Sequence, residues 1–409
     1  MNFCRKIKKI IKICSQMQKN VLKYNIKLNI KIFGGFMANE LYGQLSVITM
    51  RGGEDFAKQV DNYLMGWRSS VNSFIVDAEC PRFGSGEGKG FLHESLRGHD
   101  VFIICDVFNY GATYTMYGKT VPMSPDDHFQ DLKRIIGSIA GKARRISVIM
   151  PMLYEGRQHK RSSRESLDCA MALQELVSMG VTNILTFDAH DPRVQNAIPL
   201  CGFDDIRPTY QMIKAFIKDI PELSLNENDI AIVSPDEGGM NRAMYYSSVL
   251  KLDLGMFYKR RDYTKIVNGR NPIVAHEYLG RDVAGKDIIV VDDMISSGDS
   301  MIEVAAHLKK MGAKRIFVFA TFGLFCNGSE IFDKAYENGD ITRIFTTNLI
   351  YCPEEIKSKP WYRQVNMCKY VSLLIDTLNH DESINTILNP VKKIHAYVDH
   401  AVEEGKIKI

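Results

Sequence analysis

Short apolar runs alternate with amphipathic segments along most of the chain, and this alternation restricts the possible folds more than any other feature. A strand–helix–strand rhythm predicts βαβ units built on a mostly parallel sheet. In the first half, the predicted strands are SVITM, FIVDAEC, DVFIICDV, RISVIMPML and NILTFDAH, and the predicted helices are EDFAKQVDNYL, DHFQDLKRIIGSIA and SLDCAMALQELVSMG, the last closed by Gly180.

The same rhythm restarts after a junction near residues 195–208. Its predicted helices are PTYQMIKAFIKDI, MNRAMYYSSVLK and SMIEVAAHLKKMG, and its predicted strands are DIAIVSP, LGMFYKR, DIIVVDD and RIFVFATFG. We therefore expect an α/β protein with two tandem units, each a mostly parallel sheet flanked by helices. The predicted divisions are a basic tail at 1–40, a first unit at 41–200, a second at 201–389 and an added polar helix at 390–409.

Composition and charge exclude several classes of protein. The 409 residues are 45% hydrophobic and 24% charged, which is ordinary for globular domains. No apolar run approaches the roughly 20 residues that span a bilayer, so we expect no membrane partner. The formal net charge of +4 includes nine Lys and Arg before Glu40 and no acid there, so the remainder carries 4 − 9 = −5. A mildly acidic body gives no general reason to bind nucleic acid.

The cysteines indicate the cellular compartment. There are nine of them, scattered along the chain without a C-x-x-C pair. An odd count without the spacing of a disulfide framework predicts reduced thiols. We therefore expect a cytoplasmic protein.

The first 36 residues alternate Ile and Lys and contain no small-residue cleavage site. Three interpretations of this segment remain open: a translated leader with the true start at Met37, a disordered basic tail, or a membrane-surface or targeting helix. All three place the working protein after Met37.

The strongest functional signal is DIIVVDDMISSGDSMIEV, residues 287–304. Its IIVV run is short, apolar and β-branched, which predicts a buried parallel strand. Asp292 and Asp293 then stand at the carboxyl end of that strand, where open α/β sheets bind ligands. Ser300 and Glu303 form an S-x-x-E capping box, which predicts a helix N-terminus at Ser300.

The loop ISSGD lies between these acids and the predicted helix. It offers backbone N–H groups, hydroxyls and the positive end of a helix dipole, a combination that suits a phosphate. The two acids suit either sugar hydroxyls or a divalent cation, and a phosphate together with hydroxyls describes a sugar phosphate. The alternative is that the acids only solvate a loop and cap a helix, but the coincidence of strand, loop and capping box favours a ligand.

VVDDMISSGDS resembles the phosphoribosyl-diphosphate motif of the phosphoribosyltransferase fold. The resemblance implies that Asp292 and Asp293 hold ribose hydroxyls and that the loop holds the 5-phosphate. The loop residues are Ser296, Ser297, Gly298, Asp299 and Ser300. Hydroxyls stand at both of the family's threonine positions, but Ser296 replaces an acid and Asp299 replaces a glycine. A carboxylate facing a phosphate would repel it, so we expect Asp299 to point to solvent or to a cation.

Upstream, LGMFYKRRDYTKIVNGRNP resembles the catalytic loop of the ribose-phosphate diphosphokinase family, with Lys259 and Arg261 as its two essential cations. Cations suit this role because transfer of a diphosphoryl group concentrates negative charge on oxygen atoms. Arg261 would also contact ribose 5-phosphate. A K-R-R triplet alone is more often a solvated surface, and only its place between other family motifs supports the functional interpretation.

Two further segments resemble the metal-binding motifs of this family. NILTFDAHDPRVQ would present His190, and IVSPDEGGMNRA would present Asp236. The implied cofactor is Mg²⁺, which prefers oxygen ligands and keeps several waters. A histidine is a less usual magnesium ligand, so its role depends on the resemblance.

Two segments of the first half resemble the nucleotide-binding motifs of the family. PRFGSGEGKGFLHESLRGHD would place Phe83, Ser85 and Glu87 on ATP, although Ser85 stands where Asp or Asn is usual. MPMLYEGRQHKRSSRES would place Arg157 and Gln158 on ATP, and His159 replaces the usual acid. Insertions relative to the family pattern are expected near NYGATYTMYGKTVPMSP and after Arg261.

Together these motifs imply a magnesium-dependent enzyme that makes 5-phosphoribosyl 1-diphosphate and AMP from ATP and ribose 5-phosphate, as a homo-oligomer that is often a hexamer. Two alternatives remain open. One is a non-catalytic paralogue that regulates a true synthetase, and the other is a phosphoribosyltransferase that acts on a base. The presence of Lys259, Arg261 and His190 speaks against the first, and two tandem units speak against the second.

Overall fold

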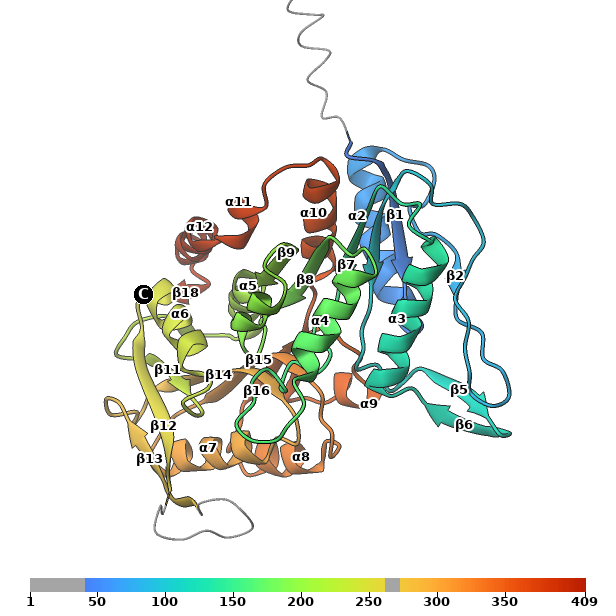
Figure 1. Ribbon diagram of the computed structural model, residues 1–409. Coiled ribbons are helices and arrows are strands. Elements are labelled where there is room, and N and C mark those ends of the chain that lie inside the picture. Colours follow the sequence, from blue (N-terminus) through green and yellow to red (C-terminus); the bar gives the residue numbers. More distant parts are fainter. Residues whose placement is uncertain (1–40, 262–272) are drawn as a thin grey trace, which may run out of the picture.

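The computed structural model describes residues 41–261 and 273–409, with residues 259–261 and 273–276 described as backbone only. Its main elements are two sheets with helices on their faces (Figure 1). The predicted fold class, two tandem α/β units with mostly parallel sheets, is confirmed. The predicted tail at 1–40 and the polar segment that follows Arg261 as far as residue 272 lie outside the described residues.

The first sheet has five parallel strands in the order β1-β4-β7-β8-β9. Alternate residues of β4 enter two different cores, one shared with helix α2 and one with α3 and α4. Because both faces are covered, the three central strands consist mostly of buried apolar residues. The strands are β1 Gln44–Thr49, β4 His99–Ile104, β7 Arg145–Ile149, β8 Asn183–Phe187 and β9 Gly202–Ile206, and the helices are α2 Glu54–Arg68, α3 Pro125–Ile139, α4 Asp168–Ser178 and the 3₁₀ helix η1 Pro192–Ala197.

One predicted strand of this half, FIVDAEC, was wrong in extent. Only Ala78–Glu79 forms a strand, β2, which pairs with β3, Phe91–Leu92, while Ile75 makes an isolated bridge to Val47 of β1. The segment thus runs beside β1 without forming a full ladder. Its apolar residues are explained by packing at the edge of the sheet.

The insertion expected near residue 109 forms an antiparallel hairpin, β5 Thr113–Met116 and β6 Lys119–Pro122. Tyr117 and Gly118 connect the strands, and both have positive φ angles, +47° and +74°. Two positive φ angles are the signature of the tight turn that matches strand twist. The hairpin projects from the first unit at the lower right of Figure 1.

The second sheet has seven strands in the order β13-β12-β11-β14-β15-β16-β17, of which β13 runs antiparallel to β12. Helices α7 and α8 cover one face, and α5 and α6 cover the other. The strands are β11 Ile230–Ser234, β12 Asp253–Arg261, β13 Ile273–Leu279, β14 Asp287–Ile295, β15 Ile316–Gly323, β16 Arg343–Thr347 and β17 Tyr362–Val365, and the helices are α5 Thr209–Asp219, α6 Met240–Leu250, α7 Asp299–Lys310, α8 Glu330–Glu337 and α9 Glu354–Lys357. No helix of residues 41–261 or 273–409 is long and apolar enough to cross a bilayer.

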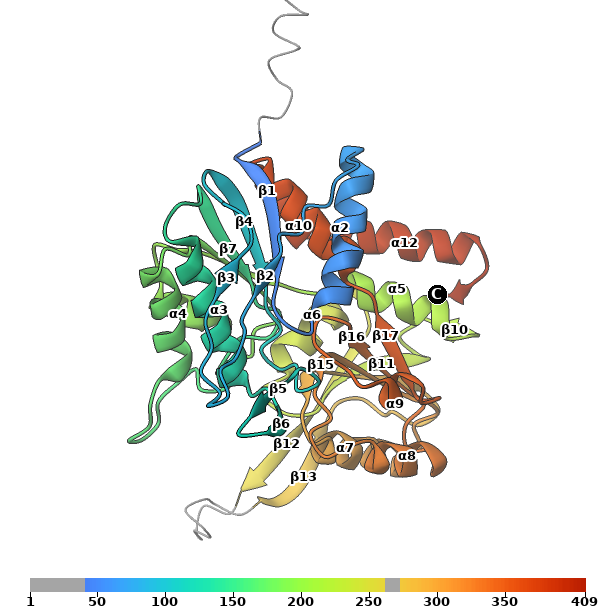
Figure 2. The same ribbon diagram turned by 90° about the vertical axis from the view of Figure 1, so that its right-hand side faces the viewer.

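Helix α10, Cys368–Asn379, follows the second sheet in sequence but packs on the first unit (Figure 2). The Ser372 hydroxyl donates to the Val60 carbonyl of α2 at 3.0 Å, and Arg68 Nε donates to Asp376 Oδ1 at 2.8 Å. The two halves therefore share one continuous core. Although α10 belongs to the predicted second unit in sequence, it packs against the first unit in space.

The C-terminal helix is more than an addition to the surface. α12, Val391–Glu403, follows the short α11, Asn385–Leu388, and leads to β18, Ile407–Lys408, which pairs in parallel with β10, Leu223–Ser224. Ile394, Ala401 and Ile407 are buried in the same core as α5 and α6. The sequence suggested a polar helix because only one narrow stripe of it is apolar.

A buried ion pair fixes α10 to the first sheet. Asp100 of β4 accepts hydrogen bonds from Arg145 Nε at 2.8 Å and Arg145 Nη2 at 2.6 Å. Asn379 Nδ2 donates to the same carboxylate at 2.8 Å, and Arg145 also donates to the Leu378 carbonyl at 2.6 Å. Asp100 is fully buried, so this network joins two strands and a distant helix where water cannot replace a lost partner.

We expect Asp100→Asn to destabilise the protein by about 3 kcal/mol, because it leaves the Arg145 charge buried without its main counter-ion. The matched control is Asp381→Asn, which removes an exposed carboxylate 3.7 Å from the same guanidinium and should cost less than about 1 kcal/mol. Urea unfolding followed by circular dichroism measures both. Equal midpoints for the two variants would contradict the assignment.

Candidate active site

The two adjacent acids lie near the carboxyl end of β14, in the middle of the second sheet. β14 pairs in parallel with β11 and β15, which explains the buried IIVV run before the acids. The strand continues past them to Ile295. Asp293 is buried, whereas Asp292 is half-buried.

Asp293 makes the contact between the two halves of the chain. Its Oδ2 lies 2.7 Å from His190 Nδ1, from the loop after β8 of the first sheet. The same oxygen lies 3.5 Å from Arg242 Nη2 on α6. A predicted sugar-binding acid and a predicted metal-binding histidine are thus direct neighbours, although 103 residues separate them in sequence.

These contacts divide the roles of the two acids. Burial raises the pKa of Asp292 well above its usual value, and the neighbouring Asp293 charge adds to this. Burial acts in the same direction on Asp293, but the His190 hydrogen bond and the Arg242 charge outweigh it and lower its pKa. Asp293 is therefore the acid of the pair that is held in ion pairs, while Asp292 makes no ion pair among the described residues and is the candidate for contact with a ligand.

Arg242 is a functional candidate that sequence reasoning missed. Its Nε donates to Asp188 Oδ1 at 2.6 Å and its Nη2 to the Ala189 carbonyl at 3.1 Å. The Thr321 hydroxyl donates to the other Asp188 oxygen at 2.7 Å. Burial acts to lower the pKa of Arg242, but the charges of Asp188 and Asp293 raise it. The available signal was an arginine in the first turn of a helix that directly follows the SPDEGG loop.

The turn that presents His190 is held from both sides. Asp188 adopts a positive φ of +44°, which is uncommon outside glycine. The Ala189 N–H donates to Asp205 Oδ1 at 2.8 Å, opposite the Arg242 bond to its carbonyl. Burial raises the pKa of Asp205 to about 6.

The predicted nucleotide residues Arg157 and Gln158 lie on the loop after β7, and Arg157 lines the same small cavity as His190 and Asp293. Gln158 Nε2 donates to the Ser166 carbonyl at 2.8 Å, so its amide closes the loop on itself. His159 is packed beside His190, with ring centroids 5.3 Å apart. Burial lowers the pKa of His159, against the opposing effects of Asp191 and the backbone of Arg157.

The candidate phosphate loop begins directly after β14. Ser296 and Ser297 are half-buried, and Asp299 and Ser300 are exposed, as the expected repulsion between Asp299 and a phosphate requires. Gly298 is buried at φ +96°, and a Cβ there would lie 2.1 Å from the Phe332 ring. Only glycine fits this position without displacing the α8 side chain.

The predicted capping box was wrong. α7 begins at Asp299, one residue earlier than expected, and its N-cap is Gly298 with no side-chain hydrogen bond. Gly298, in the left-handed conformation, is the residue from which the chain enters the helix, the position that was predicted for Ser300. The first N–H groups of α7 are consequently not capped by the N-cap side chain, which preserves them for an anion.

Asp236 lies on the loop between β11 and α6. Its Oδ1 accepts from the Gly238 N–H at 2.8 Å and the Gly239 N–H at 3.2 Å. A Cβ on Gly239 would lie 2.8 Å from the Ser234 hydroxyl and 3.3 Å from the Val291 carbonyl. The glycine thus lets the Asp236 loop approach β14, the strand that carries the two acids.

The other predicted ATP residues lie apart from this centre within one chain. Phe83, Ser85 and Glu87 form a small hairpin, with Phe83 57% exposed and Ser85 Oγ donating to Glu87 Oε2 at 2.7 Å. The Tyr117 N–H donates to the Gly84 carbonyl at 2.8 Å, which fixes the hairpin to the β5–β6 turn. Figure 1 shows that turn well away from β14.

Lys259 and Arg261 end strand β12, and their backbone pairs with β13. The predicted catalytic cations thus stand at the end of a strand, as expected. Their side chains lie outside the described residues.

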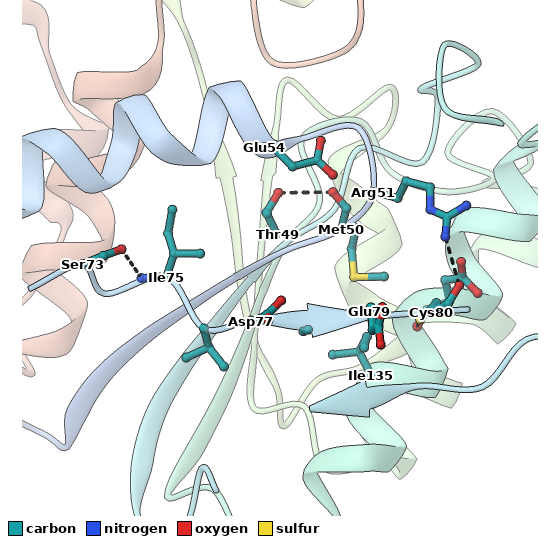
Figure 3. Close-up of a pocket in the computed structure, with 13 residues that line it drawn as sticks. Thr49, Met50, Arg51, Glu54, Ser73, Ile75, Asp77, Glu79, Cys80 and Ile135 are labelled. Atoms are coloured by element: carbon teal, nitrogen blue, oxygen red, sulfur yellow. Dashed lines mark hydrogen bonds between the residues drawn. The ribbon is translucent and has the colours of Figure 1, made fainter. Parts of the chain in front are cut away.

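A larger pocket of about 480 Å³ lies at the carboxyl end of β1 (Figure 3). Its walls come from β1, the start of α2, the segment before β3 and the inner face of α3. Arg51 at its edge donates to the Cys80 and Thr113 carbonyls at 3.2 and 3.1 Å. None of the predicted site residues lines this pocket, so it is separate from the candidate site around Asp293.

In the part of the chain that the structure describes, no group of three or more His, Cys, Asp or Glu side chains is arranged to hold a metal ion. The donors present still suit a shared ion. His190 is oriented through Nδ1 by a carboxylate, an arrangement common to metal-binding histidines. A cation here would complete its shell with water and ligand oxygens.

Comparison with known proteins identifies relatives of both halves of the chain. Residues 45–180 match the N-terminal domain of ribose phosphate pyrophosphokinase, and residues 203–335 match the phosphoribosyl transferase domain. The ribose-phosphate pyrophosphokinase of Chromobacterium violaceum is 26% identical over 85% of this chain and 96% of its own length. That of Haemophilus influenzae is 29% identical over 77% of this chain and 92% of its own.

A crystal structure of phosphoribosylpyrophosphate synthetase from Mycobacterium smegmatis is similar in fold, with a TM-score of 0.68 and 22% identity over 83% of this chain and 99% of that chain. The fold and the site define an α/β protein built from phosphoribosyltransferase-like units. Within that class, the chain belongs to the ribose-phosphate pyrophosphokinase family of enzymes.

The raised pKa of Asp205 predicts a pH-dependent stability. A carboxyl with a folded-state pKa of about 6, against 3.8 normally, binds a proton more tightly in the folded state, so its contribution is full below about pH 4 and is lost as pH rises through about 6. Asp205→Asn keeps the acceptor for Ala189 but does not titrate. Relative to wild type, it should therefore gain about 1–3 kcal/mol of unfolding free energy between pH 4 and 7. Urea unfolding at both pH values measures this, and a pH-independent difference would contradict it.

Proposed function

We propose that this enzyme transfers the β,γ-diphosphoryl group of ATP to the 1-hydroxyl of ribose 5-phosphate, giving 5-phosphoribosyl 1-diphosphate and AMP for nucleotide biosynthesis. The observation that carries the proposal is the 2.7 Å contact between His190 of the first unit and Asp293 of the second. It supports a single reaction centre in which a sugar phosphate held by β14 faces a nucleotide held by the other sheet.

On the sugar side, Asp292 would accept hydrogen bonds from ribose hydroxyls, since Asp293 is already occupied by His190 and Arg242. The 5-phosphate would lie on residues 296–300, which lead into α7 through the N-cap Gly298, where no side chain caps the helix. The positive end of a helix dipole favours an anion there. In this arrangement the sugar is held at both ends, which fixes its 1-hydroxyl toward the first unit.

On the nucleotide side, Arg157 would bind the triphosphate, because its planar guanidinium contacts two phosphate oxygens at once. Gln158 would contribute to nucleotide binding, and His190 and Asp236 would hold Mg²⁺ together with the phosphates. Magnesium, when bound, would neutralise charge on the phosphate oxygens. The 1-hydroxyl oxygen would then attack the β-phosphorus and give up its proton to water, the bond from that phosphorus to the α,β-bridging oxygen would break, and AMP would leave.

The remaining residues enter the proposal through the family resemblance. Lys259 and Arg261 would stabilise the charge that develops during transfer, and Arg261 would also contact the sugar phosphate. Phe83, Ser85 and Glu87 lie apart from Asp293 in one chain, which supports a homo-oligomer, possibly a hexamer, in which another copy completes the adenine site. We also propose a first domain at 41–200, a second at 201–389 and a cytoplasmic location, which suits the unpaired cysteines of the described chain.

With ATP, Mg²⁺ and ribose 5-phosphate, the purified protein should release AMP only when the sugar is present. Lys259→Ala should lower turnover by about 100-fold or more, because it removes a cation that acts mainly in the transition state. Arg260→Ala, which changes the middle position of the K-x-R pattern, is the matched control and should retain most activity. AMP and the diphosphate product are measured by chromatography.

The same assay separates the alternatives. Absence of AMP with every pentose phosphate would favour a regulatory protein, and consumption of 5-phosphoribosyl 1-diphosphate together with a free base would favour a transferase. Equal activity of the Lys259 and Arg260 variants would exclude the proposed role of Lys259.

Asp299 should weaken binding of the sugar phosphate. It is the first residue of α7 and replaces a glycine of the family pattern, so its charge lies at the end of the proposed phosphate site. Asp299→Asn should lower KM for ribose 5-phosphate by about 3–10-fold with little change in kcat, since removing a like charge near a partly exposed anion is worth about 1 kcal/mol. Steady-state kinetics at low ionic strength measure the effect, and Asp340→Asn, which changes a half-buried carboxylate outside the proposed site, is the control. A higher KM in Asp299→Asn would show that this carboxylate helps binding.

A further inference from the structure

Four lysines gather on one face of the second unit, and no acid neutralises them. The members of this lysine cluster are Lys214 and Lys218 of α5, Lys369 of α10 and Lys393 of α12. None of the four makes an ion pair among the described residues, and the acid next to Lys218, Asp219, is already paired with Arg343 and Arg363. Burial lowers the pKa of Lys214, and the charges of the other three lysines lower it further. The lysine cluster therefore repels itself unless an anion binds to it.

A pair of tyrosines holds two of these lysines. Lys393 Nζ lies 4.5 Å from the centroid of the Tyr210 ring, and Lys214 Nζ lies 5.9 Å from the centroid of the Tyr397 ring. The two rings meet edge to face with centroids 6.0 Å apart, so they join α5 to α12. Because an aromatic face attracts a cation, the two ammonium groups are kept at this junction of α5 and α12.

A pocket of about 300 Å³ lies beside the lysine cluster, between α5, α10 and the chain that leads through α11 into α12. Lys393 and Tyr210 both line it, so the pocket and the lysine cluster are continuous. Its volume is within the range of pockets that hold small molecules. The polar residues of its lining are Gln211, Thr377, Glu382, Ser383, Thr386 and Lys393.

The pocket contains hydrogen-bond acceptors that the protein does not use. Gln211 Oε1 is buried and has no hydrogen-bond partner among the described residues. Buried polar atoms nearly always have a partner, so this oxygen points to a donor that a ligand brings. Glu382 lines the same pocket as Lys393, yet it makes no ion pair with that lysine or with another cation of the described chain.

We propose that this pocket binds a sugar or polyol that carries at least two phosphate groups. Gln211 and Glu382 would accept hydrogen bonds from its hydroxyls, and the lysine cluster would bind its phosphates. More than one phosphate is indicated because the lysines come from three helices, and because Lys214 and Lys218 are about 6 Å apart along the axis of α5. Four lysines against one glutamate leave the site with an excess of positive charge.

This site is separate from the candidate active site and does not rest on the proposed function. In Figure 1, helices α5, α11 and α12 lie well away from α7, at whose start the candidate phosphate loop lies. Lys369 and Lys393 lie beyond residue 335, where the match to the phosphoribosyl transferase domain ends. No role for this face is therefore carried over from the family.

Fructose 1,6-bisphosphate is a suitable probe, because it has two phosphates and free hydroxyls and is not a substrate of the proposed reaction. Isothermal titration calorimetry of the full chain at low ionic strength should show saturable binding. Lys393→Gln and Lys214→Gln should each weaken this binding about tenfold or more, since each removes a charged partner of a phosphate. Gln211→Met should weaken it about threefold or more, but should change binding of inorganic tripolyphosphate, which has no sugar hydroxyls, by less than about twofold.

Two variants are matched controls. Lys310→Gln makes the same change at an exposed lysine at the end of α7, on the opposite face of the second sheet. Ser297→Asp places a carboxylate in the candidate phosphate loop. Both variants should bind fructose 1,6-bisphosphate as the wild type does, and circular dichroism checks that every variant folds.

Lack of binding to the wild type would overturn the proposal, and so would wild-type affinity in Lys393→Gln and Lys214→Gln. An equal loss in Lys310→Gln would show non-specific attraction between charges, and a loss confined to Ser297→Asp would place the probe in the active site; either result also overturns it. If Gln211→Met kept its affinity for the probe, the pocket would not hold the sugar and the proposed ligand class would be wrong. Binding that depends on the lysines and on Gln211, in a protein that releases no AMP with ribose 5-phosphate, would support this site while rejecting the proposed reaction.

Discussion

One buried guanidinium links the residues that the two halves of the chain bring to the candidate site. Arg242 pairs with Asp188 from the first sheet and lies near Asp293 from the second, and it also holds the carbonyl of the turn that presents His190. A buried ion pair adds little net stability, because desolvation offsets most of the attraction. What the network supplies is position, because Arg242 lies near Asp293 and also holds the turn that presents His190, which keeps these two residues together. The fold can therefore bring His190 of the first unit within hydrogen-bond distance of Asp293 of the second.

The same network explains why two neighbouring acids can persist at the end of one strand. Asp293 pairs with His190 and lies near Arg242, while burial raises the pKa of Asp292, which makes no ion pair among the described residues. The raised pKa of Asp292 lessens the repulsion between the two acids, because it favours the neutral form of one carboxyl. A ligand that donates hydrogen bonds, or brings a cation, removes the penalty on Asp292. The two neighbouring acids thus have different surroundings, and of the two only Asp293 has ion-pair partners among the described residues.

Features encoded by local periodicity were predictable from the sequence, and features created by tertiary contact were not. The βαβ rhythm predicted both sheets, because a buried parallel strand is apolar on both faces. Two predictions were wrong. The strand predicted at FIVDAEC is only two residues long, Ala78–Glu79, because its apolar residues pack at the edge of the sheet. Helix α7 begins at Asp299 because the left-handed Gly298 is its N-cap. Motif spacing singled out His190 and Asp293 separately, but nothing local relates residues 103 positions apart. Arg242 and the buried stripe of α12 escaped notice for the same reason, since a charge or a narrow apolar face has meaning only against its partner.

The departures of this chain from the family pattern are concentrated where ligands would bind. The scaffold needs its glycines: Gly298 lies against Phe332 and Gly239 lies against β14, and neither position has room for a side chain. Ser296, Asp299 and His159 are not constrained in this way, because their side chains are at least partly exposed or face the site. Packing therefore fixes the shape of the centre, while its charge and donor atoms can change at little cost to the fold. This separation is why the family and the architecture follow from the sequence more directly than the choice of metal or the affinity for the sugar phosphate, which depend on a few side chains that the core does not restrain.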